Sequence, residues 1–336
     1  MPGKKITIKD VARLAGVGVG TVSRVLSGTG YVGEETRERV MRAIGEMNYR
    51  PDEMARNLRR GQTRTVGVIL PDMANPLFAR IISHTEEKLR QQGYSALLTS
   101  SFSNPTLEIE LFQSLASRKV DGLVVVPCSE DDPAMTELLA NWGKPVVIMD
   151  RYMLGDAPLV GHVQTDHAMG MRQAVDTLAA RNHHTVMLFY LDMTRPGLER
   201  RRGFLEAVER HQGRLQAELE CGHERPDSGY RVLKSRLERG PVPDGLVVGH
   251  NRMLPGVLRA LRERGVEVGR DISLICCDET ELTEFYSPPI SVIRRDLSLI
   301  GEAAYEVFMR LNSDSSEQRC VVLPTEFVET ASVRHL

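Results

Sequence analysis

The chain has 336 residues, 41% of them hydrophobic and 26% charged, a balance typical of a soluble globular protein with two or three domains. No stretch approaches the ~18 consecutive apolar residues of a membrane-spanning helix, and the N-terminal MPGKKITIKD lacks the apolar core of an export signal. Five cysteines without metal-ligand spacing indicate reduced thiols of a cytoplasmic protein, and they predict neither disulfides nor a metal site.

The net charge of −2 conceals an uneven distribution along the chain. Residues 1–64 contain 13 Lys and Arg against 7 Asp and Glu, a net charge of +6, and the remainder carries a net charge of −8. A basic head on an acidic body is typical of a protein whose first part contacts a polyanion such as DNA.

Two short helices are predicted at the start of the chain. Thr7 stands where a hydroxyl can cap the first helix, and Gly16-Val17-Gly18 then separates it from the second. The apolar residues of both recur at helical spacing: Ile8, Val11, Ala12 and Ala15 in the first, and Val22, Val25 and Leu26 in the second. This pattern predicts a helix–turn–helix.

The second of these helices displays a polar face opposite its apolar one. Arg24 lies on that face beside Gly20, flanked by the hydroxyls of Thr21 and Ser23. An arginine can bond a guanine edge while short hydroxyls hold phosphates, so the face is suited to the DNA major groove. The alternative is an ordinary helical hairpin with a solvated face.

A third helix and a basic linker complete the first part. Glu34 and Glu35 open the helix, as the helix dipole prefers, and its buried stripe is Val40, Ile44 and Met47. Residues 52–65 then combine Ala55 and Leu58 with three arginines, Arg56, Arg59 and Arg60. Such a segment is suited to a minor-groove wedge that folds mainly on DNA, although a plain surface linker helix would have a similar composition.

From Val66 onward, strands and helices alternate in a pattern that predicts parallel sheets covered by helices on both faces. Two segments, Asp121–Val125 and Asp244–Val248, are identical pentapeptides, DGLVV. The repeat favours two lobes of one architecture, although a common strand pattern can also recur by chance. A final helix (297–311) and strand (320–323) follow the second lobe, so the chain is expected to return to complete the first.

Ten motifs in order resemble the lac repressor/galactose repressor family of bacterial transcription regulators over essentially the whole chain. They are TIKDVARLAGV, TVSRVLSG, ETRERVMRAIGEMNYRP, ARNL, TVGVILPDMANPLF, VDGLVVVP, DR at 150–151, RRRGF at 200–204, ISLICCDET and PPISVI at 288–293. The resemblance implies an all-α helix–turn–helix head (1–51), a hinge helix (52–64) and an α/β effector-binding and dimerisation domain (65–336). That domain would resemble periplasmic sugar-binding proteins, with lobe 1 at about 65–162 plus 293–322 and lobe 2 at about 163–292 plus 323–336.

The resemblance also implies how such a protein works. A homodimer would bind double-stranded operator DNA, and a small molecule between the lobes would change the dimer interface and the spacing of the hinge helices. Because Gly20 has no side chain, base discrimination is expected to depend on Arg24 and on DNA deformability. The implied DNA contacts are Thr7, Val19, Gly20, Thr21, Ser23 and Arg24 in the head, and Ala55, Arg56, Leu58 and Arg59 in the hinge helix.

The effector is expected at the carboxyl ends of the parallel strands, in the crevice between the lobes. The resemblance assigns it to Asn75, Phe78, Asp150, Arg200, Asn251 and Asp278, each of which could instead be a cap or a surface ion pair. The sequence departs from the family pattern at one of these positions. Where the family has Asn-Asp, this chain has His250-Asn251-Arg252, with an apparent deletion of one residue. Arg252 beside Arg200 would favour a sugar acid or phosphosugar over a neutral sugar, unless it points to solvent.

Two other classes of protein remain as alternatives. A solute-binding protein for uptake would lack the basic head and would carry an export signal. An enzyme would need a nucleophile–base pair, a phosphate loop or a metal motif, and none is recognisable. The sequence therefore predicts a cytoplasmic transcriptional regulator, a repressor without cofactor or metal, controlled by a sugar-like or sugar-acid metabolite. Since no heptad repeat is evident near the end of the sequence, we expect a dimer and not a tetramer.

Overall fold

The computed structural model describes residues 6–49, 62–155, 157–211, 213–223, 225–313 and 319–336. The chain divides into two compact units, Met1–Thr63 and Arg64–Leu336. The predicted hinge helix falls almost entirely on residues 50–61. Its candidate DNA contacts therefore lie outside the described residues, namely Ala55, Arg56, Leu58 and Arg59.

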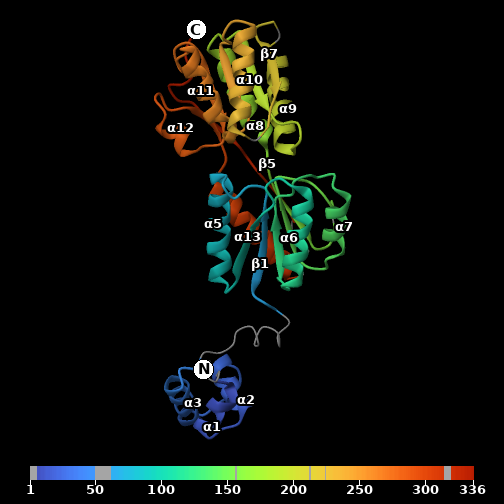
Figure 1. Ribbon diagram of the computed structural model, residues 1–336, viewed down its shortest axis with the longest axis vertical. Helices are drawn as coiled ribbons and strands as arrows, with labels where there is room; N and C mark the ends of the chain where they lie inside the picture. Colours follow the sequence, from blue (N-terminus) through green and yellow to red (C-terminus); the bar gives the residue numbers. More distant parts are fainter. Residues whose placement is uncertain (1–5, 50–61, 156, 212, 224, 314–318) are drawn as a thin grey trace. The chain divides into compact units, whose positions relative to one another are not determined.

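Three helices are described in the first unit: α1 (Ile8–Ala15), α2 (Val19–Ser27) and α3 (Glu34–Glu46) (Figure 1). Thr7 is the N-cap of α1, and its backbone N–H donates to the Asp10 carboxylate at 3.0 Å. Their apolar faces meet in one small core, formed by Val11, Ala12, Ala15, Val22, Val25, Val40 and Ala43. The predicted helical head is confirmed.

In the second unit, the described strands form two six-stranded sheets, one in each lobe. The first has the order β11-β5-β4-β3-β1-β2, and every neighbouring pair is parallel. Its strands are β1 (Thr65–Leu70), β2 (Ser95–Ser100), β3 (Gly122–Val125), β4 (Val146–Met149), β5 (Val160–Thr165) and β11 (Cys320–Leu323). Its helices are α5 (Pro76–Gln91) and α13 (Leu297–Asn312) on one face, and α6 (Pro105–Ser117) and α7 (Pro133–Asn141) on the other (Figure 1).

The second sheet repeats this plan with the order β12-β10-β9-β8-β6-β7, in which only β12 runs antiparallel to its neighbour among the described strands. Its strands are β6 (Thr185–Tyr190), β7 (Gln216–Cys221), β8 (Gly245–Val248), β9 (Ser273–Cys277), β10 (Ser291–Arg294) and β12 (Glu326–Val328). Helices α8 (His167–Ala180) and α9 (Arg195–Arg210) cover one face, and α10 (Pro226–Arg239) and α11 (Leu254–Arg264) cover the other. Two short elements, η1 (Asn251–Met253) and α12 (Glu281–Phe285), lie in its loops.

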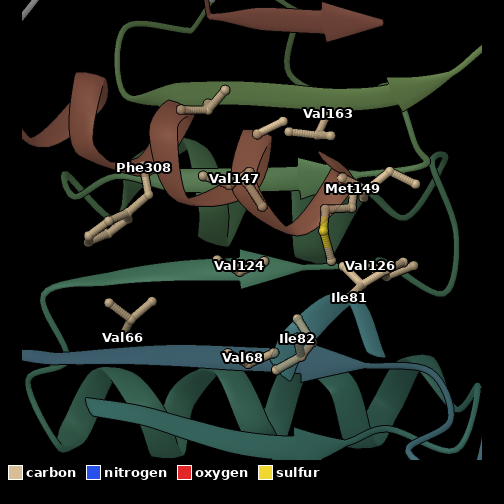
Figure 2. Close-up of a cluster of buried hydrophobic side chains, with 14 of the residues drawn as sticks. Val66, Val68, Ile81, Ile82, Val124, Val126, Val147, Met149, Val163 and Phe308 are labelled. Atoms are coloured by element: carbon tan, nitrogen blue, oxygen red, sulfur yellow. The ribbon is translucent and has the colours of Figure 1, made fainter. Parts of the chain in front are cut away.

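The central strands are apolar on both faces because helices bury both. Figure 2 shows the core between the first sheet and α5 and α13, where strand valines face Ile81, Ile82 and Phe308. The labelled side chains of the sheet in that core are Val66, Val68, Val124, Val147, Met149 and Val163, with Val126 just after β3. Each fully buried aliphatic side chain contributes roughly 1.5–3 kcal/mol, so these layers hold the strand ends in fixed positions. The predicted two-lobed α/β architecture is confirmed.

The repeated pentapeptide occupies equivalent places in the two lobes, since residues 122–125 form β3 and residues 245–248 form β8. The aspartate that precedes each strand has the same role. The Asp121 carboxylate accepts from the backbone N–H of Arg64 at 2.7 Å, just before β1, and Asp244 accepts from that of Thr185 at 2.9 Å, where β6 begins. The identity therefore reflects an internal structural repeat.

Within the described residues the chain passes from one lobe to the other three times, after β5, after β10 and between β11 and β12. These crossings place residues just beyond β5 and β10 at the junction of the lobes. None of the helices in the described ranges is long and apolar enough to cross a membrane.

Candidate functional site

The exposed face of α2 carries the residues predicted to contact DNA. Val19, Gly20 and Arg24 are exposed, and Thr21 and Ser23 are half-buried at the edge of the head's core. Thr7, the other predicted contact, is exposed at the start of α1. The apolar side of α2 is fixed by Val22 and Val25, so its polar side is presented to solvent as one surface.

The aliphatic stem of Arg24 lies beside the loop between α2 and α3. Gly30 in that loop adopts a left-handed conformation (φ 77°), and a Cβ placed on it would lie 3.4 Å from Cδ of Arg24. A side chain at position 30 would therefore touch the arginine stem, whereas glycine leaves space beside this exposed residue.

The two candidate effector acids occupy equivalent positions at the carboxyl ends of strands. Asp150 follows β4 and Asp278 follows β9, and both have left-handed backbones (φ 52° and 72°), which aspartate tolerates better than most residues. The backbone N–H of each donates to the next strand of its own sheet, from Asp150 to Val163 at 3.0 Å and from Asp278 to Ile293 at 2.9 Å. The geometry aims one carboxylate from each lobe into the crevice.

A chain of ion pairs joins these acids across the lobes. Arg295, just after β10, donates through Nη1 to Asp150 at 2.6 Å and through Nε to Asp278 at 2.6 Å. Arg200 of α9 donates to the other oxygen of Asp278 at 3.2 Å and to the carbonyl of Gly249 at 2.8 Å. Burial is the largest single influence and opposes ionisation of both acids, but Arg295 and the other neighbouring basic side chains together outweigh it. The pKa of Asp150 therefore lies well below the usual value, and that of Asp278 is also lowered.

Neutral histidines lie beside this network. His167 Nε2 is 3.5 Å from Oδ1 of Asp150, which also accepts a bond from the Thr165 hydroxyl at 3.2 Å. Burial, reinforced by the positive charge of Arg200, lowers the pKa of His167 to about 4 and that of His250 to about 3. Both rings are therefore uncharged at neutral pH, and Arg200 and Arg295 supply the positive charge of the crevice.

Because the pKa values of these two histidines are lowered in the folded chain, we expect the free energy of unfolding to fall as the pH is lowered. In the unfolded chain a histidine has a pKa of about 6.5 and binds a proton below that pH, whereas the folded residue stays neutral. Their contribution to stability is therefore complete above a pH of about 6.5 and is lost progressively below it. We expect each ring to cost about 1.4 kcal/mol of unfolding free energy between pH 7.5 and pH 5.5. Urea denaturation should show that His250→Gln loses about 1.4 kcal/mol less than the parent chain over this interval. Equal losses would contradict the prediction.

The remaining predicted effector residues lie around the same crevice. Asn75 caps α5, accepting at Oδ1 from the backbone N–H of Leu77 at 3.2 Å, and Nδ2 of Asn251 donates to that same oxygen at 3.1 Å from the opposite lobe. Five of the six predicted residues line one small cavity of about 40 Å³: Asn75, Phe78, Asp150, Arg200 and Asp278. Asn251 touches this set through Asn75.

Arg252 does not reach this cavity. Its guanidinium lies 3.3 Å from the Asp72 carboxylate and 3.5 Å from the Ala74 carbonyl, both in the first lobe. It therefore forms a partly exposed bridge between the lobes, and it points neither into the crevice beside Arg200 nor to open solvent. The reason is that η1 directs the side chain toward the loop before α5.

Seven of the twelve described wall residues were not predicted as effector contacts, and three of them are ionisable: Arg151, His250 and Arg295. These three lie just beyond the carboxyl ends of β4, β8 and β10, so the rule that ligands meet strand carboxyl ends could have found them. Arg295 in particular stands immediately after PPISVIR. Nothing in the sequence, however, pairs it with Asp150, which is 145 positions away.

Two family models match the chain. Residues 7–52 match the model described as bacterial regulatory proteins, lacI family, and residues 175–333 match a periplasmic binding protein-like domain. Among curated relatives, the HTH-type transcriptional repressor PurR of Pasteurella multocida (strain Pm70) is 32% identical over 333 residues, 98% of each chain. PurR of Klebsiella pneumoniae (strain 342) is 31% identical over 97% of this chain and 96% of its own.

Solved structures of bacterial transcription regulators also resemble this chain over almost its whole length. The lac repressor dimer bound to operator and the anti-inducer ONPF aligns with a TM-score of 0.88 and 27% identity, over 98% of this chain and 100% of that one. The complex of the transcriptional regulator CelR with cellobiose aligns with a TM-score of 0.72 and 28% identity, over 97% and 99%. Both alignments include the head and the two lobes.

Proposed function

This chain belongs to the lacI family of bacterial regulatory proteins, and from this premise we propose that a small polar metabolite between its lobes controls its affinity for operator DNA. Like its relatives, the chain is a transcriptional repressor with a DNA-binding part and an effector-binding part. We propose the boundaries given by the sequence: a head (1–51), a hinge helix (52–64) and a two-lobed domain (65–336).

In the head, Arg24 would read a base edge from α2. Support comes from its exposure and from the net charge of +6 over residues 1–64. Val19 and Gly20 would face the bases, while the hydroxyls of Thr7, Thr21 and Ser23 would bind phosphates. The hinge residues would enter the minor groove: Ala55, Arg56, Leu58 and Arg59.

The observation that carries the proposal is the ion-pair chain from Asp150 through Arg295 to Asp278 and Arg200. It joins the strand ends of both lobes at the cavity, so a ligand that rearranges it must also change how the lobes close. In a homodimer such as that of the lac repressor structure, this closure would alter the spacing of the two heads.

The effector would be a sugar, a sugar acid or a phosphosugar. Asp150, Arg200 and Asp278 would bind its polar groups, with Asn75 and Asn251 beside them and Phe78 against a ring face. Carboxylates, amides and one aromatic side chain are the groups that such ligands need. The matched proteins are PurR repressors and a regulator bound to cellobiose, so their names do not settle one ligand class.

The proposal is tested with the full chain and DNA from the promoters beside its own gene. We expect mobility-shift titrations to reveal one fragment that is bound in preference to random duplex, and one metabolite that changes this affinity at least tenfold. Such a change corresponds to about 1.4 kcal/mol of coupling. Metabolite binding without any DNA preference would instead indicate a solute-binding protein.

A further inference from the structure

The small cavity between the lobes has more positive than negative charge. Of the described residues that line it, three are arginines, Arg151, Arg200 and Arg295, and two are acids, Asp150 and Asp278. His250, which also lines it, is neutral at pH 7 because burial lowers its pKa to about 3. The wall therefore carries one positive charge that no acid in it neutralises.

Both acids are already engaged by protein donors. Asp150 accepts from Arg295 at Oδ2 and from the Thr165 hydroxyl at Oδ1, and Asp278 accepts from Arg295 at Oδ1 and from Arg200 at Oδ2. Each carboxylate has about four acceptor sites, so both could still accept from hydroxyl groups of a ligand. Because arginines already compensate their negative charge, however, they are weaker acceptors for a neutral polyol than free carboxylates would be.

The cavity wall has, in contrast, more hydrogen-bond donors than the described residues use. A guanidinium has five N–H donors, and the hydrogen bonds of Arg295 involve only Nε and Nη1 among the described residues. Arg151 donates through Nη1 to its neighbour's carbonyl at 2.8 Å, while its buried Nε has no hydrogen-bond partner in the described part of the chain. A buried donor without an acceptor is costly, so this wall favours a ligand that brings acceptors.

We infer that Arg295 determines the ligand class of the cleft. By neutralising Asp150 and Asp278, it converts a site for hydroxyl groups into a site for an anionic group of the effector, a carboxylate or a phosphate, received by Arg295 and Arg151. The inference rests on the proposed function, since it concerns the same cavity, and it narrows the effector to an anion. It also assigns the preference for an anion to Arg295 and Arg151, because Arg252 lies outside the cavity.

The cavity is small for such a ligand. Its volume of about 40 Å³ leaves room for only a few water molecules, each of which needs roughly 10–15 Å³. A neighbouring open groove of about 690 Å³ shares Leu77, Asp278 and Arg295 with it. Arg295 thus lies between the two volumes, and a small rotation of its side chain toward the groove would join them while its charge stays near the acids.

The first test uses the unaltered full chain and matched ligand pairs. Gluconate is compared with glucitol and galactonate with galactitol for the carboxylate, and glucose 6-phosphate with glucose and ribose 5-phosphate with ribose for the phosphate. At constant ionic strength, calorimetry should give at least tenfold tighter binding for one anion than for its neutral partner. The inference is overturned if every neutral partner binds as well as its anion, or if no anion in the panel binds.

The second test compares two arginines. Arg295→Gln should weaken binding of the preferred anion at least tenfold and raise affinity for its neutral partner, because the freed carboxylates become stronger acceptors. Arg239→Gln is the matched control, since Arg239 pairs with Glu220 at 2.7 Å and lines neither this cavity nor the neighbouring groove. We expect that control to stay within twofold of the parent chain. Unchanged selectivity in a folded Arg295→Gln chain would contradict the inference, and if that variant does not fold, the ligand pairs decide alone.

Failure of this inference can be told apart from failure of the proposed function, because binding is measured without DNA. An anion that binds selectively but leaves operator affinity unchanged supports the role of Arg295 and contradicts the allosteric proposal. If only a neutral sugar changed operator affinity, the allosteric proposal would be supported and the role of Arg295 would be contradicted.

Discussion

Arg24→Ala is expected to abolish the preference for operator over random DNA while leaving weak, salt-sensitive binding. Arg24 is exposed on α2, so its loss would remove the guanidinium that we expect to contact a base. A bidentate arginine–guanine pair discriminates by about 1–3 kcal/mol, and a symmetric dimer would contain two, about 2–6 kcal/mol together. Competition titrations at one fixed salt concentration measure the ratio of specific to nonspecific affinity.

The matched control for this substitution is Arg42→Ala. Arg42 is also an exposed arginine of the head, but it lies on α3. Its removal lowers the net charge equally and should reduce both affinities slightly, leaving their ratio unchanged. If Arg24→Ala behaved in the same way, α2 would not be the element that reads the bases.

Asp278→Ala is expected to lower the unfolding free energy by about 3–5 kcal/mol, because it breaks a buried ion pair by removing one partner. Arg200 and Arg295 have side chains only 5% and 6% exposed, and both donate to this carboxylate. Arg200 would keep only the Gly249 carbonyl, and Arg295 only Asp150. Urea denaturation of the full chain, monitored on the two-lobed domain, measures the loss.

Two variants sharpen this measurement. Glu279→Ala, at the neighbouring and partly exposed acid, should change stability by less than about 0.5 kcal/mol. Asp278→Asn keeps the size and tolerates the left-handed backbone (φ 72°), so it isolates the loss of charge. A loss below about 1 kcal/mol for Asp278→Ala would mean that the guanidiniums find water or other acceptors, and that the network does not hold the lobes together.

Much of the fold could be predicted because its signals are local. The helical spacing of Val11, Ala12 and Ala15 is sufficient to define the buried face of α1, and the apolar runs around Val66–Leu70 define β1. The DGLVV repeat correctly indicated two lobes of one architecture, since its aspartates cap equivalent strands. Such patterns depend on neighbours a few residues away, and tertiary packing did not override them.

The site was harder to predict because its contacts cross the lobes. Asp150 and Asp278 could be selected from their places after strands and from the family resemblance, and Arg200 from the resemblance alone. The structure brings the three together at one cavity. Their roles in binding remain predictions. The partner that joins Asp150 to Asp278 could not be predicted, because it depends on how the chain crosses between lobes after β10. The position of Arg252 could not be predicted for the same reason, since its contact with Asp72 depends on the relative placement of two loops.

Control by the cleft has a physical basis in the charges found there. Because ion pairs between protein side chains join the lobes, an effector bound there would act by replacing or extending them. The energy available for coupling is therefore the difference between two sets of charge-assisted bonds, which is of the order of 1–3 kcal/mol in allosteric proteins. This is enough to change operator affinity about 5–150-fold.

The most direct test of the central claim, DNA recognition by the first sixty residues under control of the lobes, is one affinity ratio. Fluorescence anisotropy of the full chain at 150 mM salt should give at least about 10³-fold tighter binding to its cognate operator, found among the promoter fragments, than to a scrambled duplex. Addition of the effector should then change that ratio. Equal affinity for both duplexes, with or without any metabolite of the panel, would contradict the claim.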